Sequence, residues 1–147
     1  MIQYEKVNGN FDLTGKAAIV VGGAGGIGEA TAQMYARKGA RVAIVDCKDN
    51  CPEVAAKIAE EFGVQVIGVK CDVTSQESVD AMMKAVLEAF GEINILAAMP
   101  GFVDLYRASD ISIATIEKHM SINAVGVFRV CQAVANQMIK QGKGGKM

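Results

Sequence analysis

The sequence predicts an α/β fold built on a doubly wound parallel sheet, and two observations carry this prediction. Short apolar segments without polar alternation recur along the 147-residue chain, and each is followed by a segment with helical periodicity. Continuous apolar strands are typical of parallel sheets, because helices cover both faces of such a sheet. Strands that alternate with helices need crossover connections, which make the strands parallel.

Four strands and four helical regions can be placed in order along the chain. The strands are expected at 16–23, 41–46, 64–72 and 93–99, and the helices at 26–38, 53–63, 75–91 and 112–140. Pro52 suits the start of the second helix, and Gly63 follows its end. Ser75 can cap the third helix. The fourth helical region has apolar residues on one side, namely Ile116, Met120, Val127, Val130 and Val134.

Composition limits the classes of protein to which the chain can belong. Hydrophobic residues make up 51% of the sequence, and 15 Lys and Arg balance 16 Asp and Glu. We therefore expect one folded domain over 1–147, with no attraction to nucleic acid or to anionic lipid. The first residues lack the apolar core of a signal peptide, and the longest apolar run is broken by glycine, so we expect a soluble cytoplasmic protein.

The cysteines and the single histidine do not predict a metal site. Cys47 and Cys51 are the only close pair, while Cys71, Cys131 and His119 stand apart from them in the sequence. A metal centre needs more ligands than one such pair supplies. Reduced and mostly buried thiols are the expectation, with no metal cofactor.

A glycine-rich loop joins the first predicted strand to the first predicted helix, where the chain reads VVGGAGGIGEA (20–30). Gly22, Gly26 and Gly28 have the spacing G-x-x-x-G-x-G, and Ile27 lies between the last two. Glycine permits a tight turn and close approach of a pyrophosphate, and the helix N-terminus attracts phosphate. No Lys-Ser or Lys-Thr pair follows Gly28, which argues against a triphosphate P-loop. The loop predicts dinucleotide binding, with a plain turn as the alternative.

An acid, Asp46, ends the second predicted strand, 18 residues after Gly28. A carboxylate in this place can bind the hydroxyls of an adenosine ribose, and it repels the 2′-phosphate of NADP. Lys48 is close in the sequence and could weaken the preference for NAD. A solvated acid or a turn former at the strand end is the alternative for Asp46. The loop and Asp46 together favour NAD over NADP as cofactor.

With these features the sequence resembles the short-chain dehydrogenase/reductase family from Leu13 to Lys146. The resemblance rests on the residues TGK before the first strand, the glycine spacing, Asp46, CDVT at 71–74 and SINAVGVF at 121–128. It implies a Rossmann-type sheet with the strand order 3-2-1-4, truncated after about four strands. It also implies transfer of hydride between NAD and a hydroxyl or keto group of a small-molecule substrate.

The same resemblance implies roles for three further residues. Asp72 and Val73 would lie against the adenine ring of the cofactor. Asn123 would match the family's active-site Asn, which helps to hold a proton-relay water. The residues alone leave other interpretations open: an acid that precedes a helix for Asp72, and a satisfied polar residue of a helix for Asn123.

Two departures from the family pattern concern the floor of the cofactor pocket. Val21 stands where the family usually has Thr, and the residues AMPG at 98–101 stand where it usually has Asn-Asn-Ala-Gly. In the family these polar groups tie the fourth strand to the glycine loop. Because both partners are changed, no buried group is left unpaired. We therefore expect an altered floor that still lies against the loop.

The third departure concerns catalysis. The family uses a Ser and a Tyr-x-x-x-Lys pair, in which the Tyr is the acid/base. Tyr4, Tyr35 and Tyr106 are the tyrosines of this chain, and none has Lys four residues later. The chain stops where family members begin the fifth strand, so we expect the catalytic half to be absent, through truncation, frameshift or its supply by a second chain. The alternative function is a non-catalytic module that binds a nucleotide or a partner.

A sheet that stops after four strands has consequences for association. The outer edge of the fourth strand is expected to lack a partner, and the helix at 112–140 to leave an apolar face open. Such surfaces predict poor solubility or self-association, as a homo-oligomer or through the strand edge.

Overall fold

A computed structural model describes residues 11–147 of the chain. Residues 1–10 lie outside the described part. They include Tyr4 and most of the N-terminal segment in which no signal peptide is expected. Within the described residues the elements follow the predicted order of alternating strands and helices.

Four parallel strands form one sheet in the order β3-β2-β1-β4, which confirms the predicted topology. The central strands are β1 (Ala17–Val21) and β2 (Arg41–Asp46), and the outer ones are β3 (Val66–Lys70) and β4 (Ile95–Ala98). Because all four are parallel, their carboxyl ends meet at one edge of the sheet, and ligands bind at this edge in open α/β folds.

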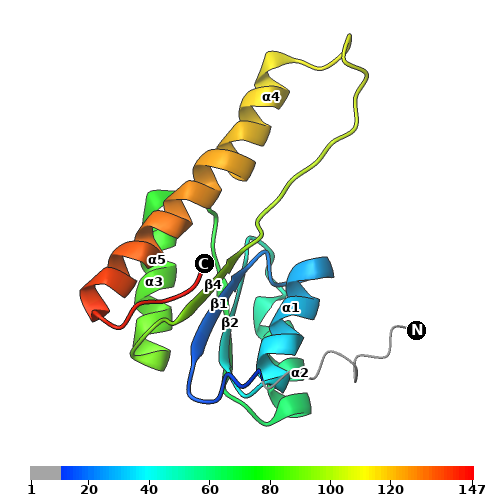
Figure 1. The fold of residues 1–147 in the computed structure, drawn as a ribbon. Coiled ribbons are helices and arrows are strands. Elements are labelled where there is room, and N and C mark those ends of the chain that lie inside the picture. The colour runs from blue at the N-terminus through cyan, green and yellow to red at the C-terminus, as the bar shows by residue number, and fades with distance from the viewer. Residues whose placement is uncertain (1–10) are drawn as a thin grey trace.

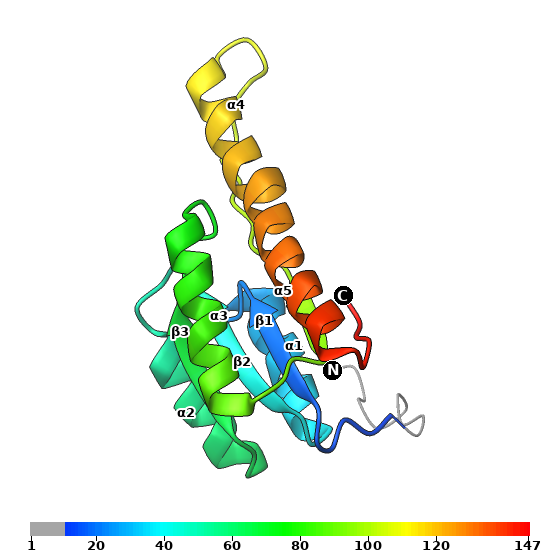
Figure 2. The same cartoon turned by 90° about the vertical axis from the view of Figure 1, so that its left-hand side faces the viewer.

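Helices cover both faces of the sheet (Figures 1 and 2). One face carries α1 (Gly26–Arg37) and α2 (Cys51–Phe62), and the other carries α3 (Gln76–Phe90) and α5 (Val127–Gln141). Successive strand residues enter the two layers in turn: Ile19, Val21, Ala43 and Val45 face α3 and α5, whereas Val20, Val42 and Ile44 face α1 and α2. This double burial is why the strands read as continuous apolar runs.

The helices begin and end at the signals that the sequence contains. Ser75 caps α3, because its hydroxyl accepts the N–H of Ser78 at 3.2 Å. Gly63 follows α2 with φ +66° and Gly91 follows α3 with φ +75°, in the left-handed region that favours glycine. Helix α2 begins at Cys51, two residues earlier than expected, since Pro52 is tolerated within the first turn.

The fourth helical region is not the single regular helix expected at 112–140. It consists of α4 (Ile113–Met120), a π-helical turn η2 (Ser121–Gly126) and α5. Gly126 permits this turn to pack closely, because a Cβ there would lie 2.6 Å from Cγ2 of Val73. The turn therefore places the helix directly against the loop that follows β3.

The predicted apolar stripe of this region divides into two parts. Val130 and Val134 are buried against the sheet, while Ile116 and Met120 are exposed. The reason is that α4 extends beyond the sheet (Figure 1). The expected open apolar face is therefore present, chiefly on α4 and η2.

The expectation that the outer edge of β4 lacks a partner is wrong for the first part of that strand. The C-terminal segment turns back after α5, and Lys146 forms a parallel bridge with Ile95. The N–H of Leu96 donates to the Lys146 carbonyl at 2.9 Å, and the N–H of Lys146 donates to the Asn94 carbonyl at 3.0 Å. The last residues thus occupy the position of a fifth strand.

Candidate cofactor site

A cleft of about 580 Å³ opens at the carboxyl ends of the strands. All seven residues predicted to bind the cofactor line it, namely Gly22, Gly26, Ile27, Gly28, Asp46, Asp72 and Val73. They come from the carboxyl ends of β1, β2 and β3, from the loops that follow and from the start of α1, which the parallel sheet brings to the same edge. Asn123 is not among the lining residues.

The floor of the cleft is formed by the chain that leaves β4. The N–H of Met99 donates to the Val21 carbonyl at 3.0 Å. Gly22 has φ +79°, and a Cβ on it would lie 2.5 Å from the Met99 carbonyl oxygen. Backbone contacts thus hold the altered segment 98–101 against the loop, as the sequence predicts, and replace the polar side-chain contacts of the family.

The glycine loop leaves the N-terminus of α1 accessible to a ligand. A Cβ on Gly28 would overlap the Gly22 carbonyl, so only glycine lets the helix approach the strand this closely. A Cβ on Gly26 would meet nothing within 4 Å, so the backbone there borders open space. The N-cap residue Gly25 has no side chain to cap the helix, which leaves the first N–H groups and the positive end of the helix dipole for an anion. Ile27 is 80% exposed at this place.

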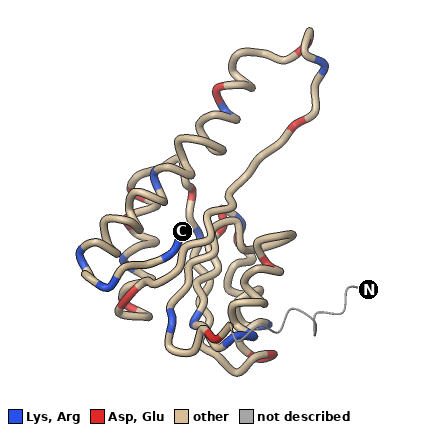
Figure 3. Tube along the Cα trace, in the orientation of Figure 1, with Lys and Arg blue, Asp and Glu red and all other residues tan. Residues whose placement is uncertain are grey.

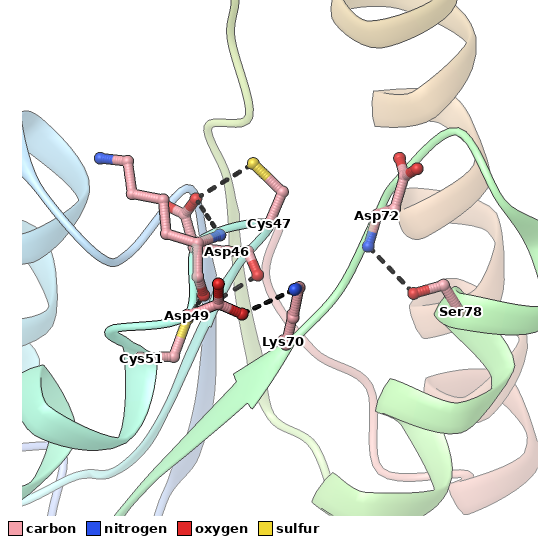
Figure 4. A network of polar contacts seen from close by, with 8 residues as sticks. Asp46, Cys47, Asp49, Cys51, Lys70, Asp72 and Ser78 are labelled. Carbon is pink, nitrogen blue, oxygen red and sulfur yellow. Dashed lines mark hydrogen bonds and ion pairs between the residues drawn. The ribbon is translucent and has the colours of Figure 1, made fainter.

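Asp46 holds the turn at one wall of the cleft (Figure 4). Its Oδ2 accepts the N–H of Ala24 at 3.1 Å, and its Oδ1 accepts the N–H of Lys48 at 3.3 Å and lies 3.6 Å from Sγ of Cys47. The carboxylate is half-buried, and each oxygen keeps acceptor capacity for a ribose hydroxyl. A carboxylate that contacts the glycine loop from the end of the next strand fits an adenine dinucleotide.

The thiols near Asp46 are protonated at neutral pH. Burial raises the pKa of Cys51 and of Cys47, and the charge of Asp46 raises both further. Burial also raises the pKa of Cys71. These thiols are therefore weak nucleophiles. Among residues 11–147 no three His, Cys, Asp or Glu side chains gather in a group that could hold a metal ion.

The wall of the cleft at Asp72 and Val73 is fixed by contacts from α5 and from its own turn. Val73 is 7% exposed, and its carbonyl accepts a hydrogen bond from the Arg129 guanidinium. The Asp72 carboxylate accepts the hydroxyl of Thr74 at 2.7 Å and its N–H at 2.9 Å. These bonds hold the pKa of Asp72 below its usual range. In Figure 4 Asp72 lies apart from the group around Asp46, so the two acids border different parts of the cleft.

Asn123 lies in η2 and contacts the loop after β4. Its Oδ1 accepts the N–H of Phe102 at 2.9 Å, and its Nδ2 donates to the Phe102 carbonyl at 2.8 Å. The side chain thereby fixes Phe102, which lines the cleft. A π-helical turn is frequent at functional sites. The role of holding a water stays a prediction, since this side chain is bound to the backbone of Phe102 here.

Outside the glycine loop, four lining residues escaped sequence reasoning: Cys47, Cys71, Phe102 and Ile122. Cys71 and Phe102 follow the ends of β3 and β4 closely. Their positions after predicted strands could therefore have placed them at the carboxyl ends of the sheet. Ile122 lies in the π-helical turn, for which the sequence has no comparable signal.

Comparison with known proteins supports the same interpretation of the site. The chain is 39% identical over 147 residues to D-threitol dehydrogenase of Mycolicibacterium smegmatis, covering 98% of this chain and 56% of that protein. It is 33% identical over 138 residues to NAD-dependent glycerol dehydrogenase of Listeria innocua, covering 94% and 53%. The structure of NAD+-bound xylitol dehydrogenase matches with a TM-score of 0.86 at 32% identity, over 91% of this chain and 52% of that chain.

The chain thus spans about half the length of these relatives. The family profile described as short chain dehydrogenase matches residues 16–146, nearly the whole sequence. The glycine spacing, the strand order and the acid at the end of β2 agree with this match. The chain belongs to the short-chain dehydrogenase family.

Proposed function

We propose that this chain is the dinucleotide-binding portion of an NAD(H)-dependent oxidoreductase. The whole protein would transfer hydride between NAD and a hydroxyl or keto group of a small molecule. One observation carries the proposal: the glycine loop and Asp46 line one cleft, with the N-terminus of α1 open to it. The NAD-dependent and NAD+-bound relatives support NAD as the cofactor.

The test of this proposal is a titration of the purified chain with NADH. The fluorescence of the reduced nicotinamide reports binding, and the chain has no Trp that would interfere. Saturable binding is expected for the wild type. Asp46→Asn keeps an acceptor for Ala24 but loses the charged acceptor for the ribose, so Kd should rise by about tenfold, or roughly 1.4 kcal/mol.

Asp49→Asn is the matched control, since it removes an acid three residues later. Asp49 pairs with Lys70 at 2.6 Å, is highly exposed and does not line the cleft. Its Kd for NADH should stay within about twofold of the wild type, because an exposed ion pair contributes little. A folded wild-type chain that binds no NADH would contradict the proposal. Equal losses in both variants would contradict the role of Asp46.

A non-catalytic module that binds a nucleotide or a partner is the second candidate. Within these 147 residues no tyrosine has Lys four residues later. A nucleotide-binding module and the oxidoreductase portion both predict NADH binding and no hydride transfer by this chain alone. They differ in the whole protein, for which only the oxidoreductase predicts hydride transfer.

We propose a cytoplasmic location and no nucleic-acid or membrane partner. Lys and Arg positions alternate with Asp and Glu positions along the trace of the described residues (Figure 3). No helix of residues 11–147 is long and apolar enough to cross a bilayer. The balance of charges supports the proposal, because nucleic acid and anionic lipid attract basic surfaces.

We also propose that the chain associates with a second copy of itself. The exposed apolar face of α4, η2 and the start of α5 consists of Ile113, Ile116, Met120, Val125 and Phe128. Exposed faces of this kind are typical of association surfaces. Light scattering should give a mass of at least two chains.

Phe128→Glu should shift this mass toward that of one chain, because a buried unpaired charge is unfavourable at an interface. Phe128 is 64% exposed, so the substitution leaves the core intact. Ala56→Glu, which adds the same charge on α2 across the sheet, is the control and should not change the mass. A wild type that is monomeric at high concentration would refute self-association.

A further inference from the structure

His119 lies on α4, where it contacts the segment that leaves β4. Its Nε2 accepts the N–H of Asp104 at 3.2 Å, and its Nδ1 lies 2.7 Å from the carbonyl oxygen of Thr115. The segment runs from the end of β4 to the start of α4 (Figure 1). The imidazole thus joins this segment to the helix that follows it.

The two bonds define the protonation state of the His119 ring. A carbonyl oxygen can only accept a hydrogen bond, so Nδ1 must carry a proton. An amide N–H can only donate, so Nε2 must carry none. The tautomer assigned from these partners is therefore the neutral ring with its proton on Nδ1. A protonated ring would direct a second N–H at the N–H of Asp104, and this bond would be lost.

The same ring packs against Phe102, a side chain that lines the cofactor cleft. The centroids of the Phe102 and His119 rings are 4.9 Å apart. Nζ of Lys118 lies 4.1 Å from the centroid of the Phe102 ring. A protonated His119 would place a second positive charge beside Phe102, and like charges repel. Protonation of one ring therefore weakens the hold on Asp104 and adds repulsion at the wall of the cleft.

The acids near His119 do not pair with it in the described part of the chain. The segment after β4 and helix α4 carry the neighbouring titratable or charged groups, namely Asp104, Tyr106, Arg107, Asp110, Glu117 and Lys118. Among residues 11–147 none of these acids forms an ion pair with the ring. Asp104 is bound through its backbone N–H, and Asp110 accepts the hydroxyl of Ser109 at 2.7 Å. A positive charge on His119 would thus gain no ion pair to replace the lost bond.

We infer that His119 is a positioning residue for the cofactor cleft: its neutral imidazole holds the segment 102–104, and protonation loosens the Phe102 wall. The inference rests on the proposed cofactor function. Histidine ordinarily changes its charge between pH 5 and 8. Binding that needs the neutral ring is strongest at the upper end of this range and weakens as the pH falls. Asn123 still binds the backbone of Phe102, so the effect is partial.

The first measurement is NMR spectroscopy of the ring nitrogens. The chain has one histidine, so the signals come from His119 alone. At pH 8 the neutral tautomer with its proton on Nδ1 is expected. The amide signal of Asp104 should shift over the same pH range as the ring, and it should not do so in His119→Gln. Neither readout involves a cofactor.

The second measurement is Kd for NADH at pH 8 and pH 5.5, on the two sides of the range in which imidazoles titrate. Each point is read within minutes, because acid degrades NADH. The wild-type Kd should rise by about threefold to fivefold at pH 5.5, as expected for loss of one hydrogen bond. His119→Gln supplies an acceptor oxygen that does not titrate. Its Kd should therefore stay within about twofold of the wild-type value at pH 8 under both conditions.

Glu117→Gln is the matched control, since it removes a charge two residues earlier on α4 and leaves the imidazole in place. Glu117 is exposed, so this variant should keep the pH dependence of the wild type. A pH dependence that persists in His119→Gln would overturn the inference. So would a proton on Nε2 at pH 8, a ring that stays neutral at pH 5.5, or a wild-type Kd that does not change while the ring becomes protonated.

Failure of the proposed function itself looks different. A folded wild type would then bind NADH at neither pH, while the tautomer of His119 and the shift of the Asp104 amide signal would be as expected.

Discussion

Replacement of Gly28 by Val is expected to destabilise the fold by about 3 kcal/mol and to abolish saturable NADH binding. Gly28 is buried at the start of α1, and any Cβ there would overlap the carbonyl oxygen of Gly22 and lie 3.0 Å from Cα of Gly23. Both neighbours are backbone, so α1 must move away from β1. This movement would open the loop that faces the cofactor. Urea unfolding followed by circular dichroism measures the first effect, and titration with NADH measures the second.

Ala30→Val is the control for Gly28→Val, since it places the same side chain two residues later in α1. Ala30 is exposed, so the change should cost only the helix propensity of Val, about 0.5 kcal/mol. Binding of NADH should be retained. An unchanged urea midpoint of unfolding in Gly28→Val, together with normal NADH binding, would show that α1 does not depend on close packing against β1.

The isolated 147-residue chain should bind NADH and yet give no hydride transfer above the rate without protein. No tyrosine of the sequence has Lys four residues later, so the family's acid/base pair is missing. Loss of general acid–base catalysis alone lowers rates by about 10²- to 10⁴-fold. The assay follows the absorbance of the reduced nicotinamide with NAD and D-threitol, glycerol or xylitol, the compounds in the names of the relatives.

The D-threitol dehydrogenase of Mycolicibacterium smegmatis is the positive control for this assay. Turnover by the isolated chain that disappears in Asp46→Asn would show that this half carries an acid/base of its own. Tyr106→Phe would then be the next variant, because Tyr106 is 53% exposed in the segment after β4.

The sequence predicted the elements that depend on local patterns. The apolar runs located all four strands, Gly63 marked the end of α2 and Ser75 the start of α3, because backbone conformation and capping depend on neighbours in the chain. The glycine loop and Asp46 were predicted to share one site for a similar reason. Parallel strands bring successive carboxyl ends to one edge, so the loop and the acid meet whatever the details of packing.

The sequence failed where contacts depend on the final arrangement in space. Nothing local in Lys146 indicates that it pairs with Ile95, because this pairing requires α5 to end beside the start of β4. The bond from Ala24 to Asp46 and those between Asn123 and Phe102 likewise join segments that are distant in the sequence. The resemblance to the family located Asn123, but it did not show that the side chain would bind the backbone of Phe102.

The strand order also sets the entropic cost of completing the site. Ala17 pairs with Arg41 across 24 residues, whereas Ala18 pairs with Ile95 across 77. Closure of the longer loop costs about 1 kcal/mol more in chain entropy. The floor of the cleft, in which Met99 contacts Gly22, lies on the more distant pairing. The cofactor cleft therefore depends on the pairing of β1 with β4, which has the longest sequence separation in the sheet. The pairings among β1, β2 and β3 close shorter loops.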